Sequence, residues 1–268
     1  SSDEAHHLYA RTGGVPLALV WSIAQMNYGY SVETILTRLS QPKNDIIKFC
    51  FDTSLTYIKD KAPYQLLMAL SLFVPDGSRD ALGFVANLAD LDRDDGVVVL
   101  EKLSLVNKET NRFSLLPITR TFATAELIKD STVAKSFNRR LVDYLLNKYS
   151  RMENEPDSEY RLRYSNPLLY QDGISVLEAL EWAYEHGTTN DVFDLSLVAI
   201  DYLDVVGRWN TLSQICGQAL DLARTVNNAP AVGRLANSKG WLLEQRGEYA
   251  EAKAHFEEGL ENYRKAGN

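Results

Sequence analysis

The fold of this chain is decided by residues 62–123, which have the sequence APYQLLMALSLFVPDGSRDALGFVANLADLDRDDGVVVLEKLSLVNKETNRFSLLPITRTFA. Apolar residues recur there every three to four positions over three successive segments, which predicts three helices. The three segments are 63–73, 80–88 and 97–105. The apolar period then falls to two in residues 105–108 and 112–115, on either side of the polar link 109–111. Alternation around a short polar link predicts a β-hairpin.

Helices followed by a hairpin form a small module known as a winged helix, and we predict one over residues 45–130. The end of a helical domain is expected before it, at residues 1–44, and a helical connector after it, at 131–190. Within the connector, the polar stretch 150–171 predicts a loop. Residues 191–268 are predicted to form α-helical hairpin repeats. The predicted fold class is therefore mainly α, with one small hairpin.

Length and charge limit the function classes. A chain of 268 residues is long enough for about two or three domains. Its 45% hydrophobic and 24% charged residues are typical of a globular protein. The formal net charge of −8 and the sequence pI of about 5.1 argue against a protein whose main role is to bind nucleic acid or an anionic membrane.

The compartment is predicted from the cysteines and from the apolar runs. Cys50 and Cys216 lie far apart, each in an apolar helical pattern, which favours buried thiols in a reducing compartment. No apolar run reaches transmembrane length, and residues 1–7 do not resemble a signal peptide. We therefore expect a cytoplasmic protein with no membrane partner.

No pattern predicts a catalytic or metal site. Neighbouring residues on a helix point about 100° apart, so His6 and His7 favour a solvated surface pair over a metal site. Ser54 lacks the G-x-S-x-G setting of a hydrolase nucleophile. The acidic run 90–95 lacks the central glycine and final glutamate of a calcium loop. We interpret this run as capping the helix that contains Val97.

The segment TGGVPLAL at residues 12–19 provides a resemblance to a known family. It resembles the GGxPLAL segment of the signal-transduction ATPases with numerous domains, the STAND class, in their NB-ARC-like form. Taken alone, the segment is also an ordinary turn before a helix, with Pro16 in the first helical turn. Four later stretches resemble segments of the same family in the same order. They are residues 51–55, 66–74, 100–106 and 112–123.

The resemblance covers roughly residues 8–130 and implies where nucleotide would bind. In this family the GGxP segment lies in a helical domain behind the ATPase domain, so Gly14 and Pro16 would contact ATP or ADP, bound with Mg, in the full-length protein. The sequence contains no G-x-x-x-x-G-K-[ST] loop, and such a loop is needed to direct backbone N–H groups at phosphates. We therefore expect a fragment with no cofactor and no enzymatic activity of its own, whose ATPase domain precedes residue 1.

One departure from the family concerns ADP sensing. The family's hairpin often ends in Met-His-Asp, and the matching positions are Leu115, Leu116 and Pro117. A leucine can neither donate a hydrogen bond to phosphate nor titrate. The resemblance therefore does not transfer the histidine-based sensor to this chain.

DNA binding is the alternative for any winged helix. Residues 45–130 contain 10 Lys or Arg and 13 Asp or Glu, so their net charge is 10 − 13 = −3. The helix expected to enter the major groove begins with Asp94 and Asp95. Because phosphate binding depends on Lys and Arg, we expect no DNA partner and interpret the module as structural.

The C-terminal part carries a helical repeat. The spacing of Gly240, Leu243, Gly247, Tyr249, Ala252, Phe256 and Leu260 resembles the tetratricopeptide (TPR) pattern. An earlier copy has its turn at Gly207, 40 residues before Gly247, and His186-Gly187 is interpreted as the end of a weaker copy. Because a TPR has about 34 residues, we expect the extra residues in a longer loop at 227–230.

In TPR arrays the first helix of each repeat lines a concave face, and its inward positions fall on one helical stripe. Counting from the turn glycines, the predicted inward residues are Asp194, Leu197, Asp201, Asp204, Arg234, Asn237, Trp241 and Glu244. A solvated face is the simpler interpretation. Against it, Trp241 is a large aromatic suited to anchor a partner, and the aspartates favour a basic or amine-bearing ligand.

Together these patterns predict the regulatory, ligand-sensing half of a STAND ATPase switch. The winged helix would act between domains, the repeats would bind a protein or peptide ligand, and the resemblance implies that activation leads to an oligomer. Two alternatives stay open: a winged-helix transcription regulator with a TPR sensor, and a plain TPR scaffold.

Overall fold

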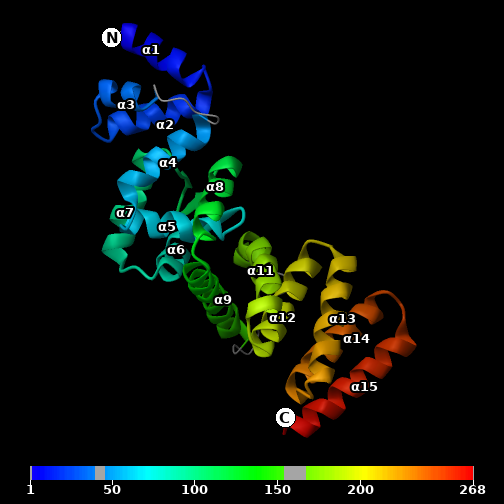
Figure 1. The fold of residues 1–268 in the computed structure, drawn as a ribbon. Helices are drawn as coiled ribbons and strands as arrows, with labels where there is room; N and C mark the ends of the chain where they lie inside the picture. The colour runs from blue at the N-terminus through cyan, green and yellow to red at the C-terminus, as the bar shows by residue number, and fades with distance from the viewer. Residues whose placement is uncertain (1, 40–45, 154–166, 268) are drawn as a thin grey trace. The chain divides into compact units, whose positions relative to one another are not determined.

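The computed structural model describes residues 2–39, 46–153 and 167–267. In these ranges it forms fourteen helices and three short strands (Figure 1). The chain divides into two compact units, Ser1–Phe137 and Asn138–Asn268, and each is described by itself. The prediction of a mainly α fold with a small hairpin and helical repeats is confirmed.

Unit 1 begins with four helices: α1 (Ser2–Thr12), α2 (Pro16–Asn27), α3 (Val32–Leu39) and α4 (Ile46–Ile58). The turn between α1 and α2 is made by Gly13 and Gly14, whose φ angles are +62° and +69°. This left-handed conformation favours glycine. Pro16 starts α2, where its missing N–H has no helical partner to lose. The indole nitrogen of Trp21 donates to the carbonyl of Ser104 at 3.0 Å, which joins α2 to the following elements.

The helix–hairpin module follows α4. Its elements are α5 (Ala62–Ser71), β1 (Asp76–Ser78), α6 (Arg79–Ala86), α7 (Asp90–Lys102), β2 (Asn107–Glu109), β3 (Arg112–Ser114) and α8 (Pro117–Leu127). The predicted three helices and hairpin are confirmed. The sheet has the order β1-β3-β2, with both pairs antiparallel. The core of the module is formed by buried side chains, among them Leu66 on α5, Phe73 just after α5, Leu82 on α6, Leu100 on α7 and Phe113 on β3.

Two details of the module differ from the prediction. The first is strand β1, because a strand of three residues is too short for an alternating pattern to be recognised in the sequence. Its Gly77 is buried, and a Cβ there would lie only 3.0 Å from the Phe73 ring. The second is that α7 begins at Asp90, before the predicted helix, so the acidic run lies in its first turns. The buried Arg93 holds it there through ion pairs with Asp80, Asp90 and Asp94.

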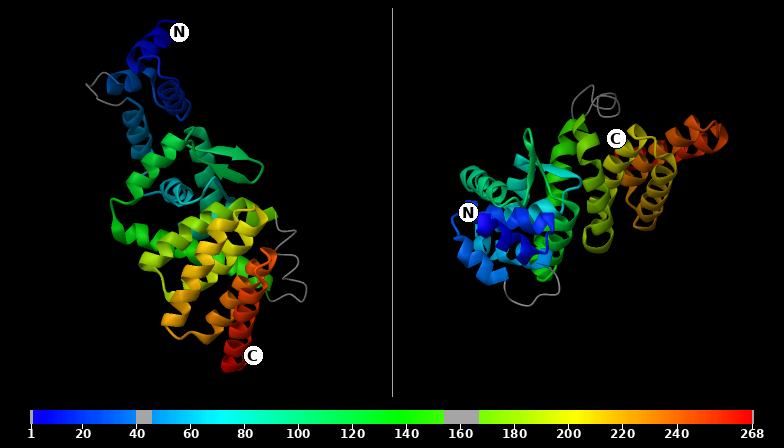
Figure 2. Two further views of the ribbon diagram at one scale, coloured as in Figure 1. Left: turned by 90° about the vertical axis from the view of Figure 1, so that its right-hand side faces the viewer. Right: turned by 90° about the horizontal axis from the view of Figure 1, so that it is seen from above.

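Unit 2 contains the C-terminal part of α9 (Ser131–Glu153), then α11 (Pro167–His186), α12 (Thr189–Val205), α13 (Trp209–Thr225), α14 (Ala229–Gln245) and α15 (Tyr249–Ala266). Both views of Figure 2 show α14 and α15 side by side at the C-terminal end. The bounds of the loop predicted at 150–171 are wrong, because α9 extends to Glu153 and α11 starts at Pro167. Its residues 154–166 lie outside the described ranges.

The hairpins repeat with a period of 40 residues. Two helices of 17 residues and two turns of three fill this period from α12 to the start of α14. The expected long loop at 227–230 is therefore wrong, because Pro230 lies in the first turn of α14 and the extra residues lengthen the helices. Gly207 and Gly247, at φ +70° and +78°, make the equivalent turns within the hairpins.

Buried side chains of α12, α13 and α14 form one apolar core, which includes Leu203, Leu212, Leu220 and Leu235. Cys50 of unit 1 and Cys216 of this core are both buried free thiols, as predicted. None of the helices in the described ranges is long and apolar enough to cross a lipid bilayer.

Candidate functional site

The residues predicted to face inward lie on α12 and α14, the first helices of two successive hairpins. The two helices contact each other, and Nη1 of Arg234 on α14 lies 2.9 Å from Oδ1 of Asp194 on α12. The structure thus brings together two residues that the repeat count had placed at equivalent positions. We call the eight predicted residues on α12 and α14 the inner face.

Most of the inner face is only partly accessible. Asn237 and Glu244 are exposed. The other six are half-buried: Asp194, Leu197, Asp201, Asp204, Arg234 and Trp241. Leu197 and Trp241 also pack against the apolar core. The inner face is therefore a set of polar groups around a partly covered apolar strip.

Trp241 is held in place by a residue that the sequence analysis did not assign to the face. Its ring lies against Trp209, the first residue of α13, with 6.4 Å between ring centroids. Arg246 Nη2 donates to the Trp209 carbonyl at 3.2 Å and fixes the turn beside it. The signal that could have found Trp209 is its position, directly after the turn glycine and Arg208. Trp241 is thus a preorganised aromatic surface, half-buried against Trp209.

The inner face is dominated by carboxylates. Asp194, Asp201 and Asp204 follow one another along α12, and Glu244 adds a fourth near the end of α14. Asp194 is paired with Arg234. Four of the eight residues of the inner face are acidic and one, Arg234, is basic, a composition that favours a positively charged partner group.

The N-terminal end of α12 is fixed by a buried carboxylate. Asp191 accepts hydrogen bonds from Nη1 and Nη2 of Arg139 on α9 at 2.6 and 3.0 Å. It also accepts from the backbone N–H and the hydroxyl of Thr188, both at 2.8 Å, in a capping box. Burial acts to raise the pKa of Asp191, but the hydrogen bonds from Arg139 and Thr188 outweigh it and the pKa is lowered. Asp191 therefore stays ionised and positions the helix that carries the inner face.

A second such contact orders α9 against α11. Asp172 is buried on α11, and one of its oxygens accepts from Lys148 Nζ at 2.6 Å and from the Tyr149 hydroxyl at 3.2 Å. These contacts connect the start of unit 2 to its first hairpin.

In unit 1, Gly14 lies in the turn between α1 and α2, and Pro16 is the first residue of α2. Pro16 is exposed and Gly14 is half-buried beside the Tyr9 ring, where a Cβ would lie 2.8 Å from that ring. At the positions that match the family's Met-His-Asp, Leu115 is buried and Leu116 is 40% exposed. Pro117 is the first residue of α8.

The described residues offer binding groups but no arrangement for catalysis by a metal. Within residues 2–39, 46–153 and 167–267, no group of three or more His, Cys, Asp or Glu side chains is placed to hold a metal ion. In the acidic run of α7, Asp90 and Asp94 are paired with Arg93, and Asp94 also with Arg79, whose Nη1 lies 2.7 Å away.

Comparisons with known proteins relate the chain to a solved structure. No protein-family model matches the chain, and neither does any curated protein. Among solved structures, the chain is similar to the crystal structure of a signal transduction ATPase with numerous domains (STAND) protein with a tetratricopeptide repeat sensor from Pyrococcus horikoshii. The two share 13% identity with a TM-score of 0.33. The match covers 93% of this chain, which spans about half, 54%, of that chain.

Proposed function

We propose that the helical repeats bind a basic protein or peptide segment on the inner face of α12 and α14, as the ligand-sensing part of a STAND-type, NB-ARC-like ATPase switch. The observation that carries this proposal is the inner face itself, which combines four carboxylates with the half-buried Trp241 on two helices that contact each other. Carboxylates attract Lys and Arg side chains, and the indole ring offers a surface for a cation or an apolar group. The motifs shared with STAND ATPases in residues 8–130 support the wider assignment.

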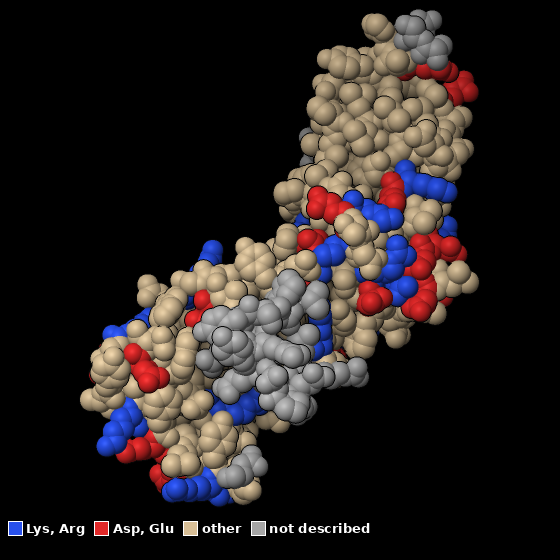
Figure 3. Space-filling model, turned by 180° about the vertical axis from the view of Figure 1, so that it is seen from behind, with Lys and Arg blue, Asp and Glu red and all other residues tan. Residues whose placement is uncertain are grey.

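In this proposal the helix–hairpin module is a winged helix that acts between domains rather than on DNA. Arg93, the first basic residue of α7, is buried among Asp80, Asp90 and Asp94, so it is not available to a phosphate group. On the face seen in Figure 3, acidic and basic side chains of unit 1 are interspersed and form no continuous basic patch. Since nucleic-acid affinity depends on such patches, a DNA-binding role is disfavoured.

Nucleotide would be held elsewhere in the switch. The exposed Pro16 and the adjacent Gly14 could add contacts to a nucleotide bound by an ATPase domain, but the chain has no phosphate-binding loop of its own. Calorimetry with ADP and this chain should therefore show no binding at micromolar concentrations. In this proposal the protein works in the cytoplasm, where ATP is abundant. Micromolar ADP binding would contradict this division of roles.

The test of the ligand is a selection from a random-peptide display library against the whole chain. The selected peptides should be rich in Lys and Arg and should bind less tightly as salt is raised. Trp241→Ala should cost about 2 kcal/mol of binding free energy or more. The double variant Asp201→Asn, Asp204→Asn should also weaken binding.

The matched control is Asp221→Asn on α13, because Asp221 is 75% exposed and lies outside the inner face. Circular dichroism and thermal melting would verify folding, since Trp241 also packs on Trp209. Selected peptides that bind all the variants equally would show that the inner face is not the ligand site, and would favour a plain scaffold.

A further inference from the structure

Two carboxylates near the start of α12 each accept a hydrogen bond from an arginine of another helix, but in different surroundings. Asp191 is buried, with hydrogen bonds from Arg139 and Thr188. Asp194 follows it on the same helix, and its side chain is 46% exposed. Among the residues that the structure describes, the Asp194 carboxylate has one partner, Nη1 of Arg234 at 2.9 Å. The contact of Asp191 is thus part of the packed helix ends, whereas the contact of Asp194 is open to exchange.

The pair of Asp194 and Arg234 joins equivalent positions of two repeats. The two residues are 40 positions apart, as are the turn glycines Gly207 and Gly247. One repeat therefore presents an arginine where the repeat before it presents an aspartate. The Arg234 side chain is 34% exposed, so both partners stay in contact with water. Exposed ion pairs are weak, because water screens the attraction and holding two side chains in one geometry costs entropy.

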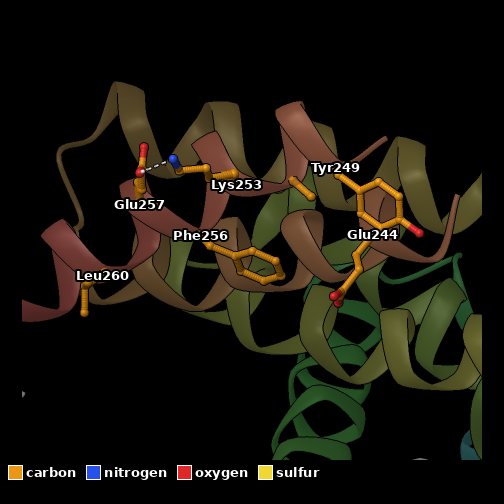
Figure 4. Close-up of a pocket in the computed structure, with 7 residues that line it drawn as sticks. Glu244, Tyr249, Lys253, Phe256, Glu257 and Leu260 are labelled. Atoms are coloured by element: carbon orange, nitrogen blue, oxygen red, sulfur yellow. Dashed lines mark ion pairs between the residues drawn. The ribbon is translucent and has the colours of Figure 1, made fainter. Parts of the chain in front are cut away.

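The opposite end of the inner face is arranged differently. Glu244 lies near the end of α14, beside the Tyr249 ring at a pocket of about 330 Å³ (Figure 4). Lys253 lines the same pocket, but it pairs with Glu257 at 3.7 Å. The chain therefore holds one of its own cations at Asp194, while the lysine at the Glu244 end is directed to a carboxylate outside the inner face.

We propose that Arg234 is an internal competitor for the basic ligand of the inner face. The inference rests on the proposed function, since it requires that this face bind segments that carry Lys or Arg. Arg234 fills the Asp194 position with the same guanidinium group that an arginine of the ligand offers. A ligand arginine reaches Asp194 only by displacing Arg234. Arg234 therefore lowers the affinity and selects against ligands that depend on a cation at this end of the face.

The size of the effect follows from the weakness of an exposed ion pair. Such a pair favours its closed form over its open form by a factor of roughly 1.4 to 5. Asp194 is then accessible in about a sixth to two fifths of the molecules, and the apparent affinity for a ligand that needs it falls by the same fraction. Removing Arg234 should therefore raise the affinity for an arginine-rich segment roughly two- to sixfold.

The probe is fluorescein-labelled hexa-arginine, whose binding to the whole chain is measured by fluorescence anisotropy at low salt. The Arg234→Gln protein should bind this probe roughly two- to sixfold more tightly than wild type. Adding Asp194→Asn to Arg234→Gln should remove the gain, because the vacated side chain is then neutral. The gain should also shrink as salt is raised, since the contact is exposed.

Arg224→Gln is the matched control. Arg224 also forms exposed pairs, with Asp221 on α13 and with Glu258 on α15. Its replacement makes the same change in net charge and releases two carboxylates that do not belong to the inner face, so the affinity should change by less than about twofold. Circular dichroism and thermal melting verify folding. The proposal is overturned by no gain in Arg234→Gln, by an equal gain in Arg224→Gln, or by a gain that survives Asp194→Asn.

Failure of the proposed function gives a different result with the same probe. Hexa-arginine that binds wild type and Trp241→Ala equally would exclude the inner face as its site, and both proposals would fall. Binding that Trp241→Ala weakens, without a gain in Arg234→Gln, would keep the inner face as the ligand site and overturn only the internal competitor.

Discussion

In unit 1 the Arg120 side chain donates to carbonyl groups 45 to 50 positions earlier in the chain, whereas in unit 2 each helix contacts mainly the helix before it and the helix after it. The first pattern connects distant elements, and the sheet adds to it by pairing β1 with β3 across two helices. The second pattern is that of a repeat array, whose stability is approximately a sum of neighbouring interfaces. The difference predicts that unit 1 unfolds as one body and that unit 2 can open helix by helix.

The largest effect should come from Arg120→Ala. Arg120 Nη1 donates to the carbonyls of Ser71, at 3.1 Å, and Phe73, and Nη2 donates to the carbonyl of Pro75, at 2.9 Å. Without the guanidinium these groups at the end of α5 lose a charged partner, so the free energy of unfolding should fall by about 3 kcal/mol. Urea denaturation measures this change.

Arg246→Ala is the control for Arg120→Ala, because Arg246 makes a comparable bond to a carbonyl but is exposed. Its cost should stay within about 0.5 kcal/mol. Equal destabilisation of the two variants would show that the long-range contacts of Arg120 contribute no more to stability than the neighbouring contact of Arg246.

An intermediate effect is expected for Asp191→Asn in unit 2. The change removes charged hydrogen bonds from Arg139 and half of the capping box with Thr188, which should lower the free energy of unfolding by about 1–2 kcal/mol. Because folding lowers the pKa of Asp191, its contribution is present above the unfolded pKa of about 3.9. The contribution is lost as the pH falls through the lower folded value.

Urea denaturation at pH 7 and below pH 4 would measure this dependence. The difference between wild type and Asp191→Asn should shrink on acidification, while the effect of Asp221→Asn stays small throughout. A difference that grows at low pH would contradict the assignment of Asp191 as an ionised cap.

The smallest effect is a difference between the labelling rates of the two buried thiols, Cys216 and Cys50. It reports local opening of the two units rather than a change in their free energy of unfolding. Burial raises the pKa of the Cys216 thiol to about 11, so a closed repeat should react very slowly at neutral pH. In urea below the main transition, Cys216 in the Cys50→Ser protein should label sooner than Cys50 in the Cys216→Ser protein, because α13 and α14 can separate locally. Equal rates would show that the two units open together.

Local patterns determined much of this molecule. The period of apolar residues predicted the helices of residues 62–105, and the polar link 109–111 predicted the hairpin. These predictions were possible because side-chain spacing follows directly from backbone geometry. The repeat was also predictable, since Gly207 and Gly247 mark turns that need a positive φ. Each of these features depends on residues within a few positions of one another.

Only the tertiary structure decided which residues meet. Strand β1 exists because β3 pairs with it, and α7 starts early because Arg93 finds Asp80 on α6. The contact of Trp241 with Trp209 and the ion pair of Arg234 with Asp194 likewise join positions 32 and 40 apart. No local period encodes such contacts, because they depend on how whole helices pack. The sequence by itself therefore determined the elements and the positions that could face a partner, while packing decided which of those positions stay accessible.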